Sequence, residues 1–331
     1  MTSAVSDWVE VIVGQNHNDP AEAWQRIFAG LRELALQSTK PGALDKATVV
    51  PDRLLANASW SLWDNFHDAP TVIDELKRFW VQISASGTAV LVLDALSLRE
   101  LPFLLAAAKD RGVAPTRVEV LGSQVPSDTD RFAQALGVPS RSKLFNNQPP
   151  TSFIFSGPDV YVDVLDAPFA DCANLVPSKP RLFLWHKWPD EPLIHLHDSQ
   201  DDGPDIVASQ TKQQLFSPEF WSFVDRIRQG RRLVITSDHG YAVSRSFSDE
   251  IKDSDTVHLL RSVFGAKRYA VESAQAPWPR RNLPPLVSKQ NRCLVVLGQR
   301  KWSVQGGFPH LCHGGLTLLE AVVPFIELAA L

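Results

Sequence analysis

Apolar side chains recur every three or four residues in the first part of the chain, the spacing that places them on one face of a helix. One such stretch follows Pro20 and a second follows Pro70. Proline suits the opening of a helix because the N–H that it lacks would have no intrahelical partner there. We therefore predict a helical N-terminal region over residues 1–85 that packs onto the rest of the chain. Its apolar positions are Trp24, Ile27, Phe28, Leu31 and Leu34, then Val72, Ile73, Leu76, Phe79 and Trp80.

Beyond residue 86 the pattern changes to short apolar runs separated by helical stretches. Alternating strands and helices predict an α/β domain with a mostly parallel central sheet sandwiched by helices. Ligands of such sheets usually lie beyond the carboxyl ends of the strands. The predicted strands are Thr88–Leu93, Val118–Leu121, Arg181–Trp185, Leu233–Thr236 and Cys293–Leu297, and the predicted helices are Pro102–Lys109, Thr129–Leu136, Pro218–Gln229 and Thr256–Phe264.

Composition narrows the class of protein without naming an activity. The 331 residues carry a net charge of −4, so we expect no strong nucleic-acid-binding patch. No apolar run reaches the roughly 18 residues of a membrane span. The three cysteines, Cys172, Cys293 and Cys312, have neither disulfide-framework nor zinc-ribbon spacing, and an odd number of thiols fits a reducing compartment. These features predict a cytoplasmic protein that does not contact a membrane.

Candidate metal ligands follow two of the predicted strands. Asp94 comes directly after the first strand, and Asp238 and His239 come one residue after the fourth. An aspartate in such a position can simply cap a helix, and that interpretation is open for Asp94 alone. A carboxylate and an imidazole side by side before the permissive Gly240 can instead bind one divalent cation.

A third group of candidate residues precedes the C-terminus. His313 has His310 and Cys312 as neighbours, but adjacent side chains usually diverge, so we expect one ligand from this turn. Thr317 and Glu320 have the spacing of a capping box at the start of a short helix.

In their order along the chain, these blocks resemble the PglZ domain, a branch of the alkaline phosphatase superfamily found in bacterial phage-defence (BREX) systems and in some response regulators. The similarity spans about residues 88–327, and it implies an alkaline-phosphatase-like metallohydrolase domain over residues 86–331 with two divalent ions. The motifs that carry it are Leu93–Asp94–Ala95–Leu96 with Glu100, Thr236–Ser237–Asp238–His239–Gly240, and His313–Gly314–Gly315–Leu316–Thr317 continuing to Val323–Pro324.

The resemblance also implies a hydroxyl nucleophile at the start of a helix. The segment Pro126–Thr129 resembles the family's nucleophile segment, with Thr129 as the nucleophile and Ser127 as the runner-up. The alternative interpretation is that these residues only cap the helix. The ligands implied for the first ion are Asp94, Asp238, His239 and the Thr129 oxygen, and those implied for the second are Asp190, His195 and His313.

The second set of ligands departs from the superfamily pattern. Four residues separate Asp190 from His195 where members often have three, so His186 and His197 are kept as reserves. A histidine-rich loop that binds nothing is the alternative. Zn²⁺ is the expected ion and Mn²⁺ the other candidate, because both accept mixed carboxylate and imidazole ligands.

The function implied by the resemblance is metal-dependent phosphoester hydrolysis in bacterial phage defence. A phosphodiester is the favoured substrate, including a nucleotide or oligonucleotide, and no lysine or arginine is assigned to phosphate binding. The alternative is a catalytically weak module that serves as a subunit of a defence complex, with defence-system proteins as partners and the tryptophan-rich N-terminal region as an interaction surface. An ordinary nucleotide-binding module is disfavoured because no glycine-rich loop follows a predicted strand.

Overall fold

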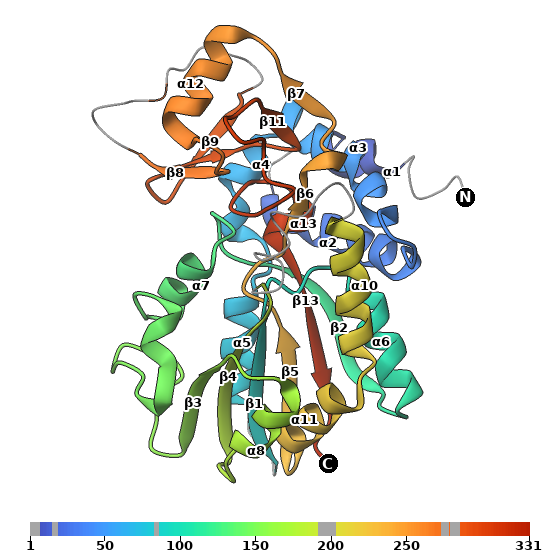
Figure 1. The fold of residues 1–331 in the computed structure, drawn as a ribbon, viewed down its shortest axis with the longest axis vertical. Helices are drawn as coiled ribbons and strands as arrows, with labels where there is room; N and C mark the ends of the chain where they lie inside the picture. Colours follow the sequence, from blue (N-terminus) through green and yellow to red (C-terminus); the bar gives the residue numbers. More distant parts are fainter. Residues whose placement is uncertain (1–6, 15–18, 83–85, 191–202, 273–277, 279–284) are drawn as a thin grey trace.

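A computed structural model describes residues 7–14, 19–82, 86–190, 203–272, 278 and 285–331. Its centre is a six-stranded sheet in the order β2-β13-β5-β1-β4-β3 (Figure 1). The neighbours β5, β1, β4 and β3 run parallel, whereas β13 is antiparallel to both β5 and β2. The bounds are β1 (Gly87–Asp94), β2 (Pro115–Gly122), β3 (Val160–Leu165), β4 (Arg181–Pro189), β5 (Arg231–Thr236) and β13 (Val322–Leu328).

This sheet confirms the predicted fold class, with one predicted strand misplaced. The first four predicted strands are β1, β2, β4 and β5 of the central sheet. The fifth, Cys293–Leu297, was wrongly expected there, because it forms β10 (Cys293–Val296) between β8 (Tyr269–Val271) and β9 (Val287–Gln290) in a separate antiparallel sheet. Strands β3 and β13 were not predicted.

Helices cover both faces of the central sheet, which explains why its strands are apolar without alternation. Along β1, Leu91 and Leu93 face one core and Val90 and Val92 face the other. The first core includes side chains of α2 (Pro20–Gln37), α6 (Leu101–Asp110), α8 (Phe169–Leu175) and α11 (Pro218–Arg228), and the second includes those of α5 (Val72–Val81), α7 (Thr129–Ala135) and η2 (Arg141–Asn147).

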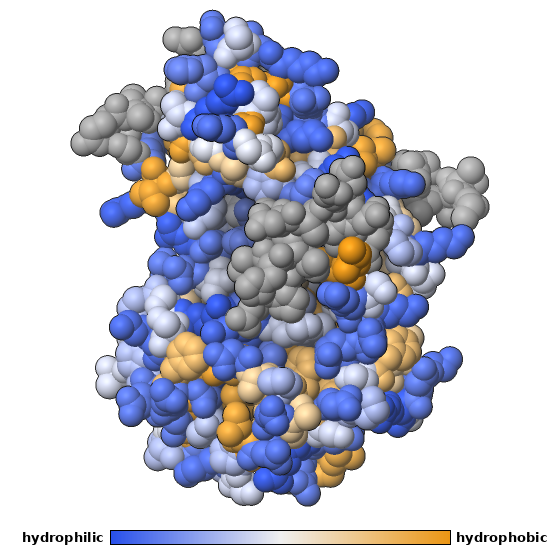
Figure 2. All heavy atoms as spheres, viewed as in Figure 1, coloured by the Kyte–Doolittle hydropathy of each residue, from blue (hydrophilic) through white to orange (hydrophobic). Residues whose placement is uncertain are grey.

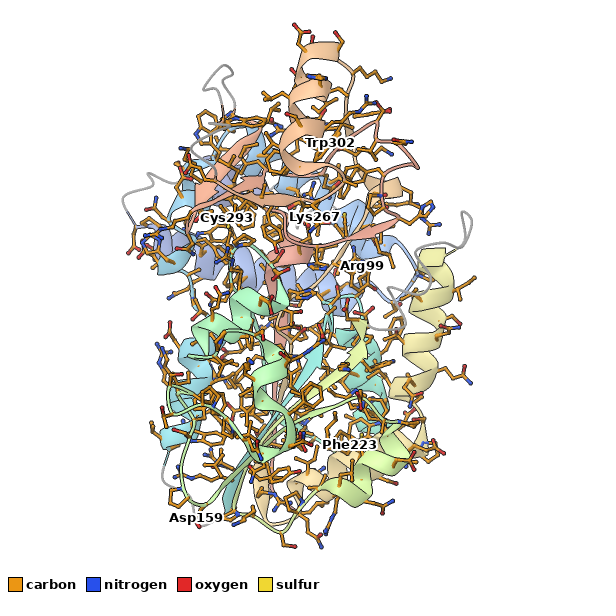
Figure 3. The ribbon with its side chains drawn as sticks, turned by 60° about the vertical axis from the view of Figure 1, so that its left-hand side comes forward. Arg99, Asp159, Phe223, Lys267, Cys293 and Trp302 are labelled. Atoms are coloured by element: carbon orange, nitrogen blue, oxygen red, sulfur yellow. The ribbon has the colours of Figure 1, made fainter. Side chains whose placement is uncertain are left out.

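The N-terminal region is helical where it is described, as predicted. Its Trp24 and Trp63 are fully buried and share one core with the sheet residue Leu91. Arg99, labelled in Figure 3, joins this region to the sheet domain through an ion pair with Asp45. The tryptophan-rich region is thus mainly core, against the alternative of an interaction surface, and the boundary after residue 85 stays a prediction. The helices are α1 (Asp7–Ile12), α3 (Ala43–Asn57), α4 (Ser61–Asp64) and η1 (Phe66–Asp68), besides α2 and α5.

A smaller lobe lies above the sheet, at the top of Figure 1, and the carboxyl ends of the parallel strands point toward it. Its core contains Phe264 and Trp302, and Trp302 lies beside α12 in Figure 3. The elements of the described chain not yet named, inside and outside this lobe, are α10 (Gly203–Leu215), β6 (Ala242–Val243), η4 (Ser244–Ser246), β7 (Asp249–Ile251), α12 (Ser254–Phe264), β11 (Arg300–Trp302), β12 (Leu311–Cys312) and α13 (Leu318–Ala321).

On the face shown in Figure 2, hydrophobic residues form small groups among hydrophilic ones. Within the described part of the chain, no helix combines the length and the apolar character that crossing a membrane requires.

Candidate metal centre

The predicted ligands converge at the carboxyl edge of the sheet because the strands that carry them are neighbours. Asp94 is the last residue of β1, Asp238 and His239 follow β5 after one residue, and Asp190 directly follows β4. Strand β1 lies between β5 and β4, so all three strand ends meet at one place. The side chains of Asp94, Asp238 and His239 are completely buried.

Three ligand atoms of this cluster are close enough to share one cation. His239 Nε2 lies 3.6 Å from Asp94 Oδ1 and 3.5 Å from Asp238 Oδ2. The three ligand atoms all lie within 4.8 Å of one another. Two carboxylates and an imidazole are a donor set suited to zinc or manganese, and burial leaves these charges with little water to solvate them. The residues therefore fit a divalent ion.

Backbone contacts aim two of these side chains into the cluster. The Ala95 N–H donates to Asp238 Oδ1 over 3.0 Å, which turns Oδ2 toward His239. His239 Nδ1 lies 2.9 Å from the Gly240 carbonyl, so a proton on Nδ1 leaves the Nε2 lone pair free for a metal. Gly240 permits this turn because a Cβ there would lie 2.2 Å from the Leu319 carbonyl oxygen.

The Thr129 hydroxyl lies at the same point. Its Oγ1 is 2.9 Å from Asp238 Oδ2, 3.1 Å from His239 Nε2 and 3.5 Å from Asp94 Oδ1. Thr129 begins α7, but Asp128 is the N-cap, and its carboxylate accepts the Asp130 N–H. Capping therefore does not occupy the Thr129 hydroxyl.

Ser127 has a different position. It is fully buried, its hydroxyl donates to the Gly315 carbonyl over 3.2 Å, and its Oγ accepts the Gly314 N–H over 2.9 Å. Both contacts hold the turn that carries His313. Of the two hydroxyl candidates, Thr129 is the one beside the carboxylates.

His313 joins the centre through His239. The two imidazole rings stack, with centroids 4.4 Å apart and an interplanar angle of 17°. His313 Nδ1 lies 3.1 Å from the Ser127 carbonyl oxygen, which leaves Nε2 as the nitrogen available for a ligand. Gly314 shapes this turn with φ +95, and a Cβ there would lie 2.5 Å from the Tyr269 ring.

The pKa values of His239 and His313 shift in opposite directions although the two rings are in contact. Burial opposes protonation of His239, but the carboxylates of Asp238 and Asp190 outweigh it and raise its pKa. Burial and the neighbouring His239 lower the pKa of His313, against an opposite effect of Asp190. The Asp190 carboxylate thus favours the protonated form of both rings.

The other predicted second-site residues do not all join this centre. His195 and His197 lie outside the described residues. His186 has both ring nitrogens engaged by backbone, Nε2 with the Ala167 carbonyl at 3.0 Å and Nδ1 with the Trp188 N–H at 3.0 Å. Burial lowers its pKa to about 4. Its reserve role is therefore wrong, because no nitrogen remains for a metal.

The C-terminal capping box is partly as predicted. The Thr317 hydroxyl caps α13 by accepting the Glu320 N–H, and it also donates to the Glu320 carboxylate over 2.8 Å. That carboxylate forms a fully buried ion pair with Arg268 and accepts the Gly315 N–H over 2.9 Å. Glu320 therefore supports the His313 turn besides the helix end.

One charged residue at the centre escaped the sequence analysis. Arg141 forms an ion pair with Asp94 through Asp94 Oδ2, on the side of the carboxylate away from Thr129. Its guanidinium carbon lies 5.9 Å from the centroid of the Trp185 ring. Arg141 belongs to no motif, and only the fold brings η2 beside the end of β1, so no sequence signal could have identified it.

The chain was compared with known families and structures. No family model matches the sequence, and no curated protein matches it. Among solved structures, phosphonoacetate hydrolase from Sinorhizobium meliloti 1021, in complex with phosphonoformate, is 15% identical, with 75% of this chain and 91% of that chain covered and a TM-score of 0.43. Murine ectonucleotide pyrophosphatase/phosphodiesterase 5, as an inactive variant in complex with AMP, is 13% identical, with 74% and 88% covered and a TM-score of 0.44.

Proposed function

We propose that this chain is a metal-dependent phosphoesterase in which the Thr129 hydroxyl is the nucleophile. The supporting observation is that Thr129 Oγ1 lies within 3.5 Å of one side-chain atom each of Asp94, Asp238 and His239. A hydroxyl nucleophile surrounded by residues of metal-ligand types suits metal-assisted phosphoryl transfer through a covalent intermediate. The order of the sequence motifs supports the same chemistry.

Asp94, Asp238 and His239 would hold one ion beside the Thr129 oxygen, and Asp190 and His313 would hold a second. His195 is proposed as a further ligand on the sequence pattern alone. Zn²⁺ is the proposed ion and Mn²⁺ the alternative. When bound, such ions lower the pKa of a coordinated hydroxyl and neutralise charge on the phosphoryl oxygens.

The residues then have distinct tasks in the reaction. Asp238 Oδ2 lies at hydrogen-bond distance from the Thr129 hydroxyl and orients it for the loss of its proton. Thr129 Oγ1 loses its proton to solvent and forms a bond to phosphorus while the bond from phosphorus to the leaving alcohol oxygen breaks, and the alcohol takes up a proton from solvent. Water then attacks the phosphothreonine, which releases the phosphate product and restores the threonine hydroxyl.

Phosphodiesters, including nucleotides or oligonucleotides, are the substrates proposed first. This choice, and a role in bacterial phage defence with defence-system proteins as partners, rest on the PglZ resemblance of the motifs. The regulatory alternative keeps the same metal centre, so measurements of hydrolysis have to separate the two.

The test is hydrolysis of bis-p-nitrophenyl phosphate and p-nitrophenyl phosphate by the purified chain loaded with Zn²⁺ or Mn²⁺. We expect Thr129→Ala to abolish turnover, Thr129→Ser to retain part of it, and acid quenching of the wild type to trap phosphate on Thr129. Thr116→Ala is the matched control, because Thr116 is exposed at the opposite end of the sheet, in β2.

Unchanged hydrolysis in Thr129→Ala would reject the nucleophile. Metal binding by the wild type without hydrolysis of either ester would favour the regulatory module.

A further inference from the structure

A cavity of about 280 Å³ lies between the N-terminal helices and the smaller lobe, and it shares no residue with the candidate metal centre. The end of α3 forms one wall, and the segments that begin β7 and β11 form the other (Figure 1). The volume is far above the roughly 30 Å³ that one water molecule occupies, and it is close to the lower limit of about 300 Å³ for ligand pockets. The polar residues that line the cavity are Arg53, Asn57, Ser248, Asp249, Gln299 and Arg300.

The wall that carries Arg300 is fixed by several contacts. The Arg300 side chain is 4% exposed, and its guanidinium donates to Asp249 Oδ2 over 3.0 Å and to Asn57 Oδ1 over 2.6 Å. Gly298, with φ +67, lets this wall approach α3, because a Cβ there would lie 2.6 Å from the Ala56 Cβ. The cavity is therefore formed by packed residues before any ligand binds, as ligand sites usually are.

One positive charge at the cavity is not neutralised by a partner. Arg300 and Asp249 form an ion pair, so their charges offset each other. The Arg53 side chain is exposed, and its guanidinium makes no ion pair or hydrogen bond with any described residue. The carboxyl end of α3 adds only a partial negative charge. The cavity therefore suits a ligand with a single negative charge, and a guanidinium binds a carboxylate through two parallel hydrogen bonds.

Other polar groups of the cavity can accept hydrogen bonds from hydroxyl groups. Gln299 is 9% exposed, and its amide nitrogen donates to Asp52, whereas its Oε1 is buried and has no hydrogen-bond partner among the described residues. A buried acceptor without a partner is unfavourable, so a hydroxyl that donates to it stabilises the complex. The Asp249 side chain is 46% exposed, and only its Oδ2 is used by Arg300, which leaves Oδ1 for a second hydroxyl.

We propose that this cavity binds a small monoanionic organic acid that carries hydroxyl groups. Its carboxylate pairs with Arg53, and its hydroxyl groups donate to Gln299 and Asp249. Sugar acids are the class of small molecule that combines one carboxylate with several hydroxyl groups. The assignment goes beyond the proposed hydrolysis, because it uses no residue of the metal centre.

The experiment is calorimetric titration of the purified full chain with gluconate, a sugar acid, and with sorbitol, the neutral polyol that has the same carbon chain. We expect one gluconate to bind per chain and sorbitol not to bind at the same concentrations. Arg53→Gln should raise the Kd for gluconate by about 10- to 100-fold, because a charged hydrogen-bonded pair is lost. Arg53→Lys keeps the charge without the planar fork, so it should restore part of the affinity.

The matched control is Lys46→Gln, which removes an exposed positive charge from α3 about two helical turns before Arg53. Lys46 does not line the cavity, so we expect the wild-type affinity for gluconate. A metal ion at the candidate centre can also bind gluconate, but that contribution is the same in the wild type and in Arg53→Gln and cancels in their difference.

Three results would overturn the assignment. They are equal gluconate affinity in the wild type and Arg53→Gln, no gluconate binding by the wild type at millimolar concentration, and sorbitol binding as tight as that of gluconate. Tighter binding of glucarate, the dianion with the same carbon chain, would overturn the preference for a single negative charge. These measurements do not depend on ester hydrolysis, so a chain that binds gluconate through Arg53 and hydrolyses neither ester would support this site and reject the proposed hydrolysis.

Discussion

The hydroxyl oxygen of Thr129 lies 2.9 Å from Asp238 Oδ2, although the two residues are 109 positions apart in the chain. The contact joins the start of α7 to the end of β5. It is possible because Asp238 is held by the Ala95 N–H through its other carboxylate oxygen. The two carboxylate oxygens of Asp238 thus have different partners: Oδ1 accepts the Ala95 N–H, and Oδ2 faces the Thr129 hydroxyl.

Because the two oxygens have different partners, Asp238→Asn should leave the fold intact and lower metal content and activity. The amide oxygen can still accept the Ala95 N–H, so the fold should persist, but an amide nitrogen replaces the charged oxygen that faces Thr129 and His239. We expect metal content to fall and kcat/KM to drop by at least about 100-fold, since a ligand charge is lost. Elemental analysis and ester hydrolysis measure both effects.

Asp159→Asn is the control, because Asp159 is exposed in a loop at the far end of the sheet domain (Figure 3). Wild-type metal content in Asp238→Asn would show that this carboxylate is not a ligand.

The strands that end at Asp94 or shortly before Asp238 and Asp190 could be predicted because they are buried on both faces and read as apolar runs. Their convergence follows from parallel pairing, which places all their carboxyl ends at one edge. Strand β13 could not be recognised, since Pro324 interrupts it and proline is unusual within a sheet. It is also antiparallel to both neighbours, which a regular alternation of strands and helices does not suggest.

Contacts between residues far apart in the sequence decide which side chains lie at the candidate site, so the sequence alone could not predict these positions. The sequence ranks Thr129 above Ser127 only through the family resemblance, whereas contacts separate them physically: the Thr129 hydroxyl lies beside Asp238, and the Ser127 hydroxyl holds the Gly314–Gly315 turn. His186 has the residue type and position of a ligand in the sequence, but backbone groups occupy both of its ring nitrogens. Arg141 lacks any local pattern because its partner Asp94 is 47 positions earlier.

Gly314→Ala should destabilise the turn that carries His313. The residue has φ +95, which costs an alanine about 1 kcal/mol, and its Cβ would also overlap the Tyr269 ring at 2.5 Å. We expect the free energy of unfolding to fall by more than that backbone cost, together with weaker metal binding.

Gly306→Ala separates the two contributions to this loss. Gly306 has φ +83, and a Cβ there meets nothing within 4 Å, so only the backbone cost applies. Urea denaturation of both variants provides the comparison, and equal losses would show that the Tyr269 contact has no effect.

Asp52 makes stability depend on pH. It is buried, accepts the Leu318 N–H over 2.8 Å and the Gln299 amide over 2.9 Å, and so ties α3 to the start of α13. Burial raises its pKa to about 7, against the opposing effect of these hydrogen bonds. The folded state therefore keeps the proton in a range where the unfolded state releases it, and the folded state loses stability as the pH rises from about 4 to about 7.

Asp52→Asn removes this titration, because an amide stays neutral at every pH. The free energy of unfolding of the variant minus that of the wild type should increase by on the order of 1–4 kcal/mol from pH 5 to pH 8, since one pKa unit corresponds to about 1.4 kcal/mol. Urea denaturation at both pH values measures the difference. A wild-type minus variant difference that stays constant with pH would exclude a raised pKa at Asp52.

In the proposed two-ion centre, His313→Ala should lower the number of bound ions from two to one. The candidate cluster of Asp94, Asp238 and His239 stays complete without His313, whereas the proposed second set of ligands loses the imidazole whose Nε2 is available. The variant also removes the ring that stacks on His239. The remaining ion should therefore bind more weakly but still in stoichiometric amount at saturating metal.

Elemental analysis after dialysis at a fixed metal concentration gives the count. His258→Ala, an exposed change on α12, is the control that should keep both ions. Two ions in His313→Ala would remove His313 from the ligands. Loss of both would mean that the carboxylates at the ends of β1 and β5 retain an ion only when the second site is filled, so that the two sites form one cooperative centre.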